Sequence, residues 1–219
     1  HSPIFVDPND LGNVWIVQIE GIQSKVHRAT ELREVLNCIG ADPKDRFFPD
    51  KILLVEGSSD KIFVSGTAEK SEIKLTHVRI IPVYGKNKSR YNFEAWKNIV
   101  KGTQIQLLLM LDHDAKADVA GLIKRKVVDP EDIILLEGDL EDLYPITVLV
   151  EVVNEIWDLG TKREELETGR RVDAIKKLLL EKKKYNDNWK DTLAEKMVQR
   201  IAKKDLPPEI KKVLDRLAS

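Results

Sequence analysis

Three short acidic motifs, each directly after a run of aliphatic residues, are the part of this sequence best suited to chemistry. They read VEGSSD at 55–60, LDHD at 111–114 and EGDLED at 137–142. Buried strands of a parallel sheet are continuous runs of Val, Ile and Leu, and open α/β sheets carry their chemistry at the carboxyl ends of the strands. We therefore expect the motifs to converge on one site. Its candidate carboxylates are Glu56, Asp60, Asp112, Asp114, Glu137, Asp139 and Glu141.

Such a set of carboxylates needs a compensating charge, because like charges at close range repel and raise each other's pKa. A divalent cation is the usual compensation, and hard oxygen ligands select Mg²⁺ or Mn²⁺. Two such ions about 4 Å apart can hydrolyse a phosphodiester, since one activates water and the other stabilises the leaving oxygen. The motifs thus predict a metal-dependent phosphoryl-transfer site that holds two Mg²⁺ or Mn²⁺ ions.

The elements that must position these side chains alternate between strands and helices. Strands are expected at residues 51–55, 78–83, 105–111 and 132–136, with helices near 60–68, 92–100 and 115–126 between them. Alternation at this spacing predicts a parallel sheet with right-handed crossovers. The predicted fold class is α/β, a Rossmann-like parallel sheet with flanking helices and a C-terminal helical region.

Three domains are predicted along the chain, at 1–45, 46–148 and 149–219. The polar, proline-containing segment 41–50 favours the first boundary. We expect Cys38 to be a small buried residue of the first domain. The further elements expected outside the sheet are a strand at 13–19 and helices at 30–39, 147–157, 171–183, around 193–201 and from Pro208 onward.

Within the motifs, spacing indicates how individual side chains should point. A helix that begins near Ser58 would direct Asp60 back toward Glu56. The alternative is that residues 58–60 only cap that helix. If the strand continues through the second motif, Asp112 and Asp114 share one face and His113 points away.

The motifs together resemble the Toprim domain of topoisomerases, primases and certain nucleases. The forms VEGSSDK, LDHD and EGDLEDLYP are most similar to the OLD (overcoming lysogenization defect) nuclease family. The resemblance implies a Toprim fold behind an ABC-type ATPase domain of the same protein, and the opening HSPIF resembles the switch-histidine segment of such an ATPase. It also implies two metal ions, held by the carboxylates above.

Roles for single residues follow from the same resemblance. It implies that Glu56 is a metal ligand or general base and that Asp60 supports the second metal. In the third motif it favours Glu141 as a ligand first and Asp139 second. If Asp112 and Asp114 share one strand face, the two carboxylates suit a bridging position between the metals. Asp142 is expected to be a cap or a surface charge. The resemblance implies a catalytic cation at Lys190; the alternative is that Lys190 is a solvated surface lysine. The basic turn after the second strand, with Lys86, Lys88 and Arg90, is expected to approach nucleic acid or to be an ordinary polar loop.

The resemblance implies a metal-dependent DNA endonuclease or nickase, with a role in phage defence. An RNA-processing or primase-like Toprim enzyme is an alternative, and so is a non-catalytic Toprim assembly module. The intact acidic positions favour an enzyme. Whether the chain is a monomer or a homodimer stays open.

Composition limits these alternatives only broadly. Residues 161–219 carry a surplus of six positive charges, and the rest of the chain is acidic. This asymmetry suits a DNA-binding surface or a solvated helical face.

One cysteine excludes a disulfide framework and favours a cytoplasmic protein. Apolar runs are too short for a membrane span, and without a Walker A motif ATP hydrolysis is not expected here. The chain begins at His1, so we expect a fragment of a longer protein.

Overall fold

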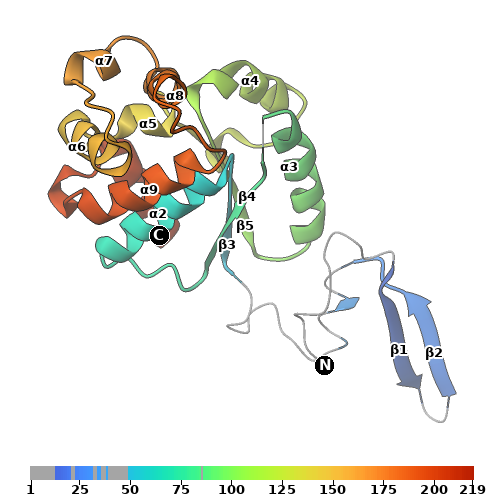
Figure 1. The fold of residues 1–219 in the computed structure, drawn as a ribbon. Coiled ribbons are helices and arrows are strands. Elements are labelled where there is room, and N and C mark those ends of the chain that lie inside the picture. The colour runs from blue at the N-terminus through green and yellow to red at the C-terminus, as the bar shows by residue number, and fades with distance from the viewer. Residues whose placement is uncertain (1–12, 21–22, 32–33, 36–37, 39–48, 85) are drawn as a thin grey trace.

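A four-stranded parallel sheet forms the centre of the molecule (Figure 1). The computed structural model describes residues 13–20, 23–31, 34–35, 38, 49–84 and 86–219. The strand order is β4-β3-β5-β6, and every neighbouring pair is parallel. The strands are β3 (Lys51–Val55), β4 (Val78–Pro82), β5 (Gln106–Leu111) and β6 (Ile133–Leu135). All four predicted strands are confirmed, each end to within one residue.

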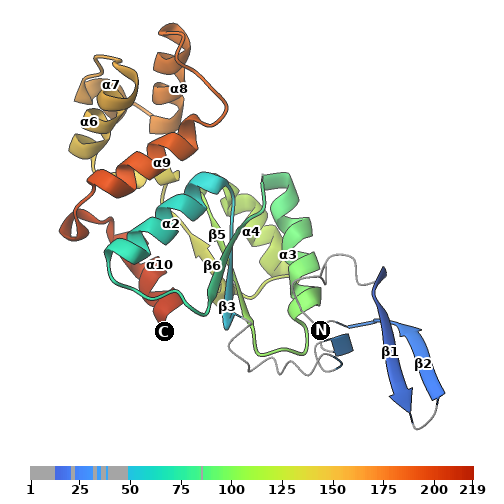
Figure 2. The same ribbon diagram turned by 60° about the horizontal axis from the view of Figure 1, so that its bottom comes forward.

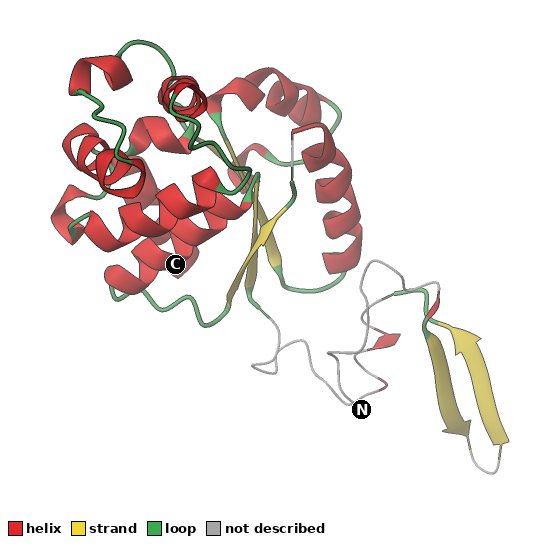
Figure 3. Ribbon diagram, viewed as in Figure 1, coloured by secondary structure: helices red, strands yellow, loops and turns green. Residues whose placement is uncertain are grey.

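Helices cover both faces of this sheet, and Figure 3 shows the three layers. Successive strand residues point to opposite faces, so Leu53 and Val55 of β3 enter one core while Ile52 and Leu54 enter the other. The second core is closed by α3 (Lys86–Val100) and α4 (Lys116–Lys124). The first is closed by α2 (Ser58–Lys70) and the C-terminal helices. Residues buried on both faces explain the uninterrupted aliphatic runs of the sequence.

The C-terminal part of the chain is helical, as predicted, and it packs against α2. Figures 1 and 2 both show α9 lying along α2. The two helices approach closely at Gly66, where an added Cβ would lie 2.6 Å from Cγ1 of Val198. The helices are α5 (Leu140–Leu143), α6 (Ile146–Trp157), α7 (Arg163–Glu167), α8 (Arg171–Glu181), α9 (Trp189–Arg200) and α10 (Pro208–Ala218). The short α5 and α7 were not predicted.

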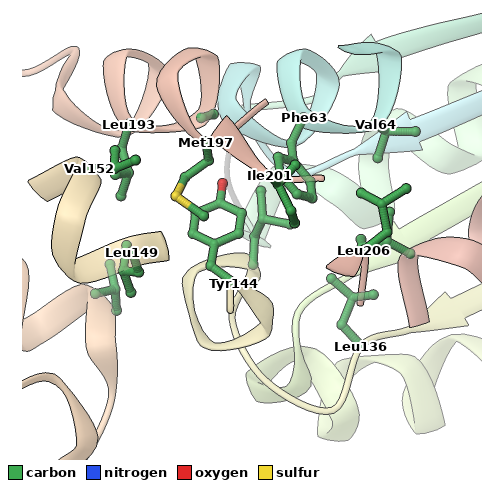
Figure 4. Close-up of a cluster of buried hydrophobic side chains, with 14 of the residues drawn as sticks. Phe63, Val64, Leu136, Tyr144, Leu149, Val152, Leu193, Met197, Ile201 and Leu206 are labelled. Carbon is green, nitrogen blue, oxygen red and sulfur yellow. The ribbon is translucent and has the colours of Figure 1, made fainter. Parts of the chain in front are cut away.

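Tyr144 lies in the middle of the core that joins these helices to the sheet (Figure 4). Its ring is tilted against that of Phe63 in α2, with the centroids 4.8 Å apart. Leu149 of α6 and Met197 of α9 belong to the same core. One hydrophobic core therefore joins residues on both sides of position 148. The division of the chain at residues 45 and 148 stays a prediction.

The N-terminal residues form an antiparallel hairpin of β1 (Trp15–Glu20) and β2 (Gln23–Arg28). The first strand was predicted and the second was not. Cys38 is exposed, so the expected burial of this residue is wrong. Most of the predicted 30–39 helix and the whole HSPIF segment lie outside the described residues.

One helix begins earlier than predicted. α3 starts at Lys86 rather than near 92, so most of the expected basic loop is helical. The side chains of residues 86–92 lie outside the described part of the structure, and with them the predicted contacts of Lys86, Lys88 and Arg90. No described helix is long and apolar enough to cross a membrane.

Candidate active site

The carboxyl ends of β3 and β5 bring the first two motifs into contact. The strands are parallel neighbours, so both end at the same edge of the sheet. Glu56 directly follows β3 and Asp112 directly follows β5. The backbone N–H of Asp112 donates a hydrogen bond to Oε1 of Glu56, at 3.0 Å. This bond fixes the glutamate beside the second motif.

Asp60 both closes the first turn of α2 and faces other carboxylates. It is 6% exposed, and its Oδ2 accepts a hydrogen bond from the backbone N–H of Gly57 at 2.7 Å. Burial is the main cause that raises the pKa of Asp60 to about 7. The charges of Glu141 and Glu56 add to it, while the Gly57 bond and Lys190 oppose it. Asp60 therefore caps α2 and also lies near other carboxylates, and its role as a metal ligand stays a prediction.

Asp112 lies among carboxylates from all three motifs. Burial raises its pKa to about 8, and the negative charges of Asp60, Glu56, Asp139 and Glu141 raise it further. We call these five residues, Glu56, Asp60, Asp112, Asp139 and Glu141, the acidic cluster. Carboxylates of all three motifs thus meet at one edge of the sheet, as predicted, although Glu56 and Asp112 are 56 residues apart in the chain.

The second motif departs from the prediction after its first aspartate. β5 ends at Leu111, and residues His113–Ala115 form a short 3₁₀ helix, so the strand does not continue through the motif. The expected alternation of Asp112 and Asp114 on one strand face is therefore wrong. Asp114 instead lies 3.4 Å from a guanidinium nitrogen of Arg170. His113 is exposed.

The third motif divides its acidic residues among different tasks. Glu137 is exposed, and it is not among the charges that raise the pKa of Asp60 or Asp112. Asp142 accepts hydrogen bonds from the backbone N–H groups of Asp139 and Arg171, at 3.1 and 3.0 Å, so it is a cap as expected. Asp139 and Glu141 are buried within the acidic cluster. Only these last two are brought to the site.

Glu141 is held by Lys190 on one side only. Its side chain is 2% exposed, and Oε1 lies 3.1 Å from Nζ of Lys190 in α9. Burial alone would lower the pKa of Lys190, but the charges of Glu141, Asp112 and Asp60 outweigh burial and raise it. Oε2 of Glu141 is buried and has no hydrogen-bond partner in the described part of the protein. A buried carboxylate oxygen without a hydrogen bond lowers the free energy of unfolding.

Sequence reasoning missed Arg170, which binds Asp139 through two hydrogen bonds. The guanidinium donates from Nε to Oδ2 at 2.8 Å and from Nη2 to Oδ1 at 2.7 Å. The next residue, Arg171, donates to the backbone carbonyls of Glu141, Asp142 and Tyr144, which fixes the α5 turn. Both arginines lie in a Lys/Arg-rich stretch, so only their place at the start of α8 could have distinguished them.

The site suits a divalent cation in charge and donor chemistry. Its donors are carboxylate oxygens, which Mg²⁺ and Mn²⁺ prefer. Two described cations, Lys190 and Arg170, contact members of this cluster of five carboxylates. One buried oxygen of Glu141, Oε2, has no hydrogen-bond partner among the described residues. No three described His, Cys, Asp or Glu side chains already stand as a finished ligand set. The residues therefore fit a divalent cation in charge and donor chemistry alone.

Comparison with known proteins gives a family match for part of the chain. Residues 47–114 match the model of the overcoming lysogenization defect protein-like TOPRIM domain. This segment is an OLD-like Toprim domain. It contains the first two motifs, whereas Glu141, Arg170 and Lys190 follow it in the chain. The acidic cluster of this Toprim domain is thus completed by the segment after it.

Solved structures show the same fold over a longer stretch. The C-terminal region of the Burkholderia pseudomallei OLD protein is 18% identical, with a TM-score of 0.57, and the match covers 78% of this chain and 98% of that one. The C-terminal region of the Xanthomonas campestris pv. campestris OLD protein is 17% identical, with a TM-score of 0.55, over 78% and 96% of the two chains. No curated protein matches the sequence. The predicted Toprim-type fold with its helical C-terminal region is confirmed.

Proposed function

We propose that this chain hydrolyses phosphodiester bonds in DNA with two divalent metal ions, Mg²⁺ or Mn²⁺. The observation that carries the proposal is Oε2 of Glu141, which is buried without a hydrogen-bond partner among the described residues. It lies in the same acidic cluster as Glu56, Asp60 and Asp112 of the OLD-like Toprim segment. The family resemblance of the motifs supports a nuclease. A site built from carboxylates alone, with a lysine beside it, suits phosphoryl transfer better than nucleophilic catalysis by the protein.

Each residue of the site then has a task. Glu56, Asp60, Asp112, Asp139 and Glu141 would hold the metal ions, and Glu56 would accept a proton from the attacking water. Bound divalent ions would supply an activated water and neutralise the departing oxygen. Lys190 would donate to the negative charge that builds up on the phosphate. Its contact with Glu141 keeps the ammonium charged and directed toward the site.

A positively charged segment next to the site supports a nucleic acid as substrate. Residues 170–190, which we call the basic arm, contain eight Lys or Arg and three Asp or Glu. Arg170 at one end contacts Asp139, and Lys190 at the other contacts Glu141. Between them α8 and the following turn expose most of their lysines, and Lys176 lies 5.9 Å from the ring centre of Tyr185. Cations beside an aromatic ring suit a phosphate backbone with stacked bases.

The wider setting follows from the family resemblance. We infer that the chain acts together with an ABC-type ATPase domain of the same protein, as a monomer or a homodimer. A role in defence against phage is part of the same proposal.

Cleavage of supercoiled plasmid tests the proposed function. The protein is incubated with Mg²⁺, Mn²⁺ or EDTA, beside Asp112→Asn and the control Asp118→Asn, an exposed residue of α4. We expect nicked or linear plasmid with metal for wild type and control, and no product with EDTA or Asp112→Asn. Cleavage of RNA but not of plasmid would favour an RNA-processing enzyme. A folded protein that binds metal and cleaves neither would favour an assembly module.

A further inference from the structure

Arg170 pairs with one member of the acidic cluster, Asp139, and also approaches Asp114. Its guanidinium lies 2.6 Å from Asp139 at the closest ion-pair distance and 3.4 Å from Asp114. The other members of the cluster are Glu56, Asp60, Asp112 and Glu141, and Lys190 contacts one oxygen of Glu141. Arg170 therefore offsets the charge of Asp139, while the other four carboxylates face one described cation, Lys190.

The position of Arg170 allows it to leave this contact. The arginine side chain is 51% exposed, whereas that of Asp139 is 5% exposed. Arg170 follows Gly169, whose φ of 86° lies in the left-handed region, and it precedes the first residue of α8. If the arginine left without replacement, Asp139 would be a buried charge without a partner, which is strongly unfavourable. A second cation is the natural exchange partner.

We propose that Arg170 is a built-in counter-cation for the second metal position. Glu56, Asp60, Asp112 and Glu141 would hold the first divalent ion. A second ion reaches Asp139 and Asp114 only by displacing Arg170, and it therefore binds more weakly than the first. The displaced guanidinium stays near the site because Arg170 directly precedes α8. It can then contact a substrate phosphate, since the planar guanidinium binds phosphate oxygens through two hydrogen bonds. This inference rests on the proposed two-metal function.

Manganese binding tests the proposal without any cleavage. Isothermal titration with Mn²⁺ compares wild type, Arg170→Gln, Arg170→Lys and Arg163→Gln, an exposed arginine paired with Glu167. We expect two unequal steps in wild type. In Arg170→Gln the second ion should bind about tenfold more tightly or better, a change of about 1.4 kcal/mol, with the first step unchanged. Arg170→Lys should be intermediate, since lysine keeps the charge but loses the two-pronged contact.

Electron paramagnetic resonance gives an independent readout. Two Mn²⁺ ions about 4 Å apart are spin-coupled, and this signal should appear at lower Mn²⁺ concentration in Arg170→Gln than in wild type. A merely structural arginine would not shift it in this direction. Equal second-step affinities in wild type and Arg170→Gln would overturn the inference while leaving the two-metal site intact. A wild-type protein that binds no ion would overturn the proposed function as well.

Discussion

Lys190 Nζ and Glu141 Oε1 lie 3.1 Å apart, although the two residues are on α9 and α5. The pair leaves the second oxygen of Glu141 buried without a hydrogen-bond partner in the described structure. The lysine thus compensates the charge of Glu141 but leaves Oε2 without a hydrogen bond. In the proposed function, the free oxygen of Glu141 would bind a metal ion and Lys190 would contact the substrate.

Lys190→Gln should abolish most cleavage while metal still binds. Loss of a group that stabilises charge only in the transition state costs about 10²- to 10³-fold in rate. Lys196→Gln is the matched control, because Lys196 lies on the same helix but pairs with Glu155 at the surface. Single-turnover plasmid cleavage and Mn²⁺ titration measure the two properties separately. Equal loss in both variants would show that Lys190 has no special role.

Glu141→Gln and Glu137→Gln should separate the two glutamates of the third motif. Only Glu141 lies in the acidic cluster, since Glu137 is exposed. A ligand that binds only the folded state stabilises it by about 2.7 kcal/mol at a hundredfold excess over its Kd. Wild type and Glu137→Gln should therefore gain thermal stability with Mn²⁺, and Glu141→Gln should gain little.

The outcome of that comparison decides which glutamate binds metal. A stabilisation lost in Glu137→Gln but kept in Glu141→Gln would reverse the assignment. Circular dichroism before metal addition shows whether each variant is folded, so a loss of structure is not mistaken for a loss of binding.

The metal-free protein should lose stability as pH rises from about 4 to about 8. The pKa values of Asp60 and Asp112 are raised from 3.8 to about 7 and about 8 in the folded state. In this window the folded protein holds protons that the unfolded chain has released, so the free energy of unfolding falls with rising pH. The loss is complete once the pH passes the higher folded value.

Thermal unfolding in EDTA between pH 5 and 8.5 measures this dependence. Asp112→Asn should flatten the curve and raise the Tm at pH 8 by about 3 °C or more, because an amide cannot ionise. Asp118→Asn should follow wild type. Parallel curves for wild type and Asp112→Asn would contradict the assignment of Asp112 to the acidic cluster.

The sheet could be predicted from the sequence, whereas the turn after β5 and the contact of Arg170 with Asp139 could not. Continuous aliphatic runs such as Lys51–Val55 identify buried strands directly, and parallel strands place Glu56 and Asp112 at one edge. The turn after β5 could not be predicted, because Asp112 and Asp114 suit both a strand and a turn. Arg170 is brought to Asp139 by packing of the C-terminal helices, and such long-range contacts leave no local pattern.

Lys190 is positioned by the close packing of α9 on α2, so a substitution far from the cluster should weaken catalysis. Gly66→Ala would place a Cβ 2.6 Å from Cγ1 of Val198. Overpacking of this kind costs about 1–3 kcal/mol, or a Tm shift of about 2–4 °C per kcal/mol for a chain of this size. It should also lower the cleavage rate, because α9 must move. The double variant Gly66→Ala with Val198→Ala removes the clash and should recover both stability and rate. A Gly66→Ala protein with wild-type Tm and rate would show that this contact does not set the position of Lys190.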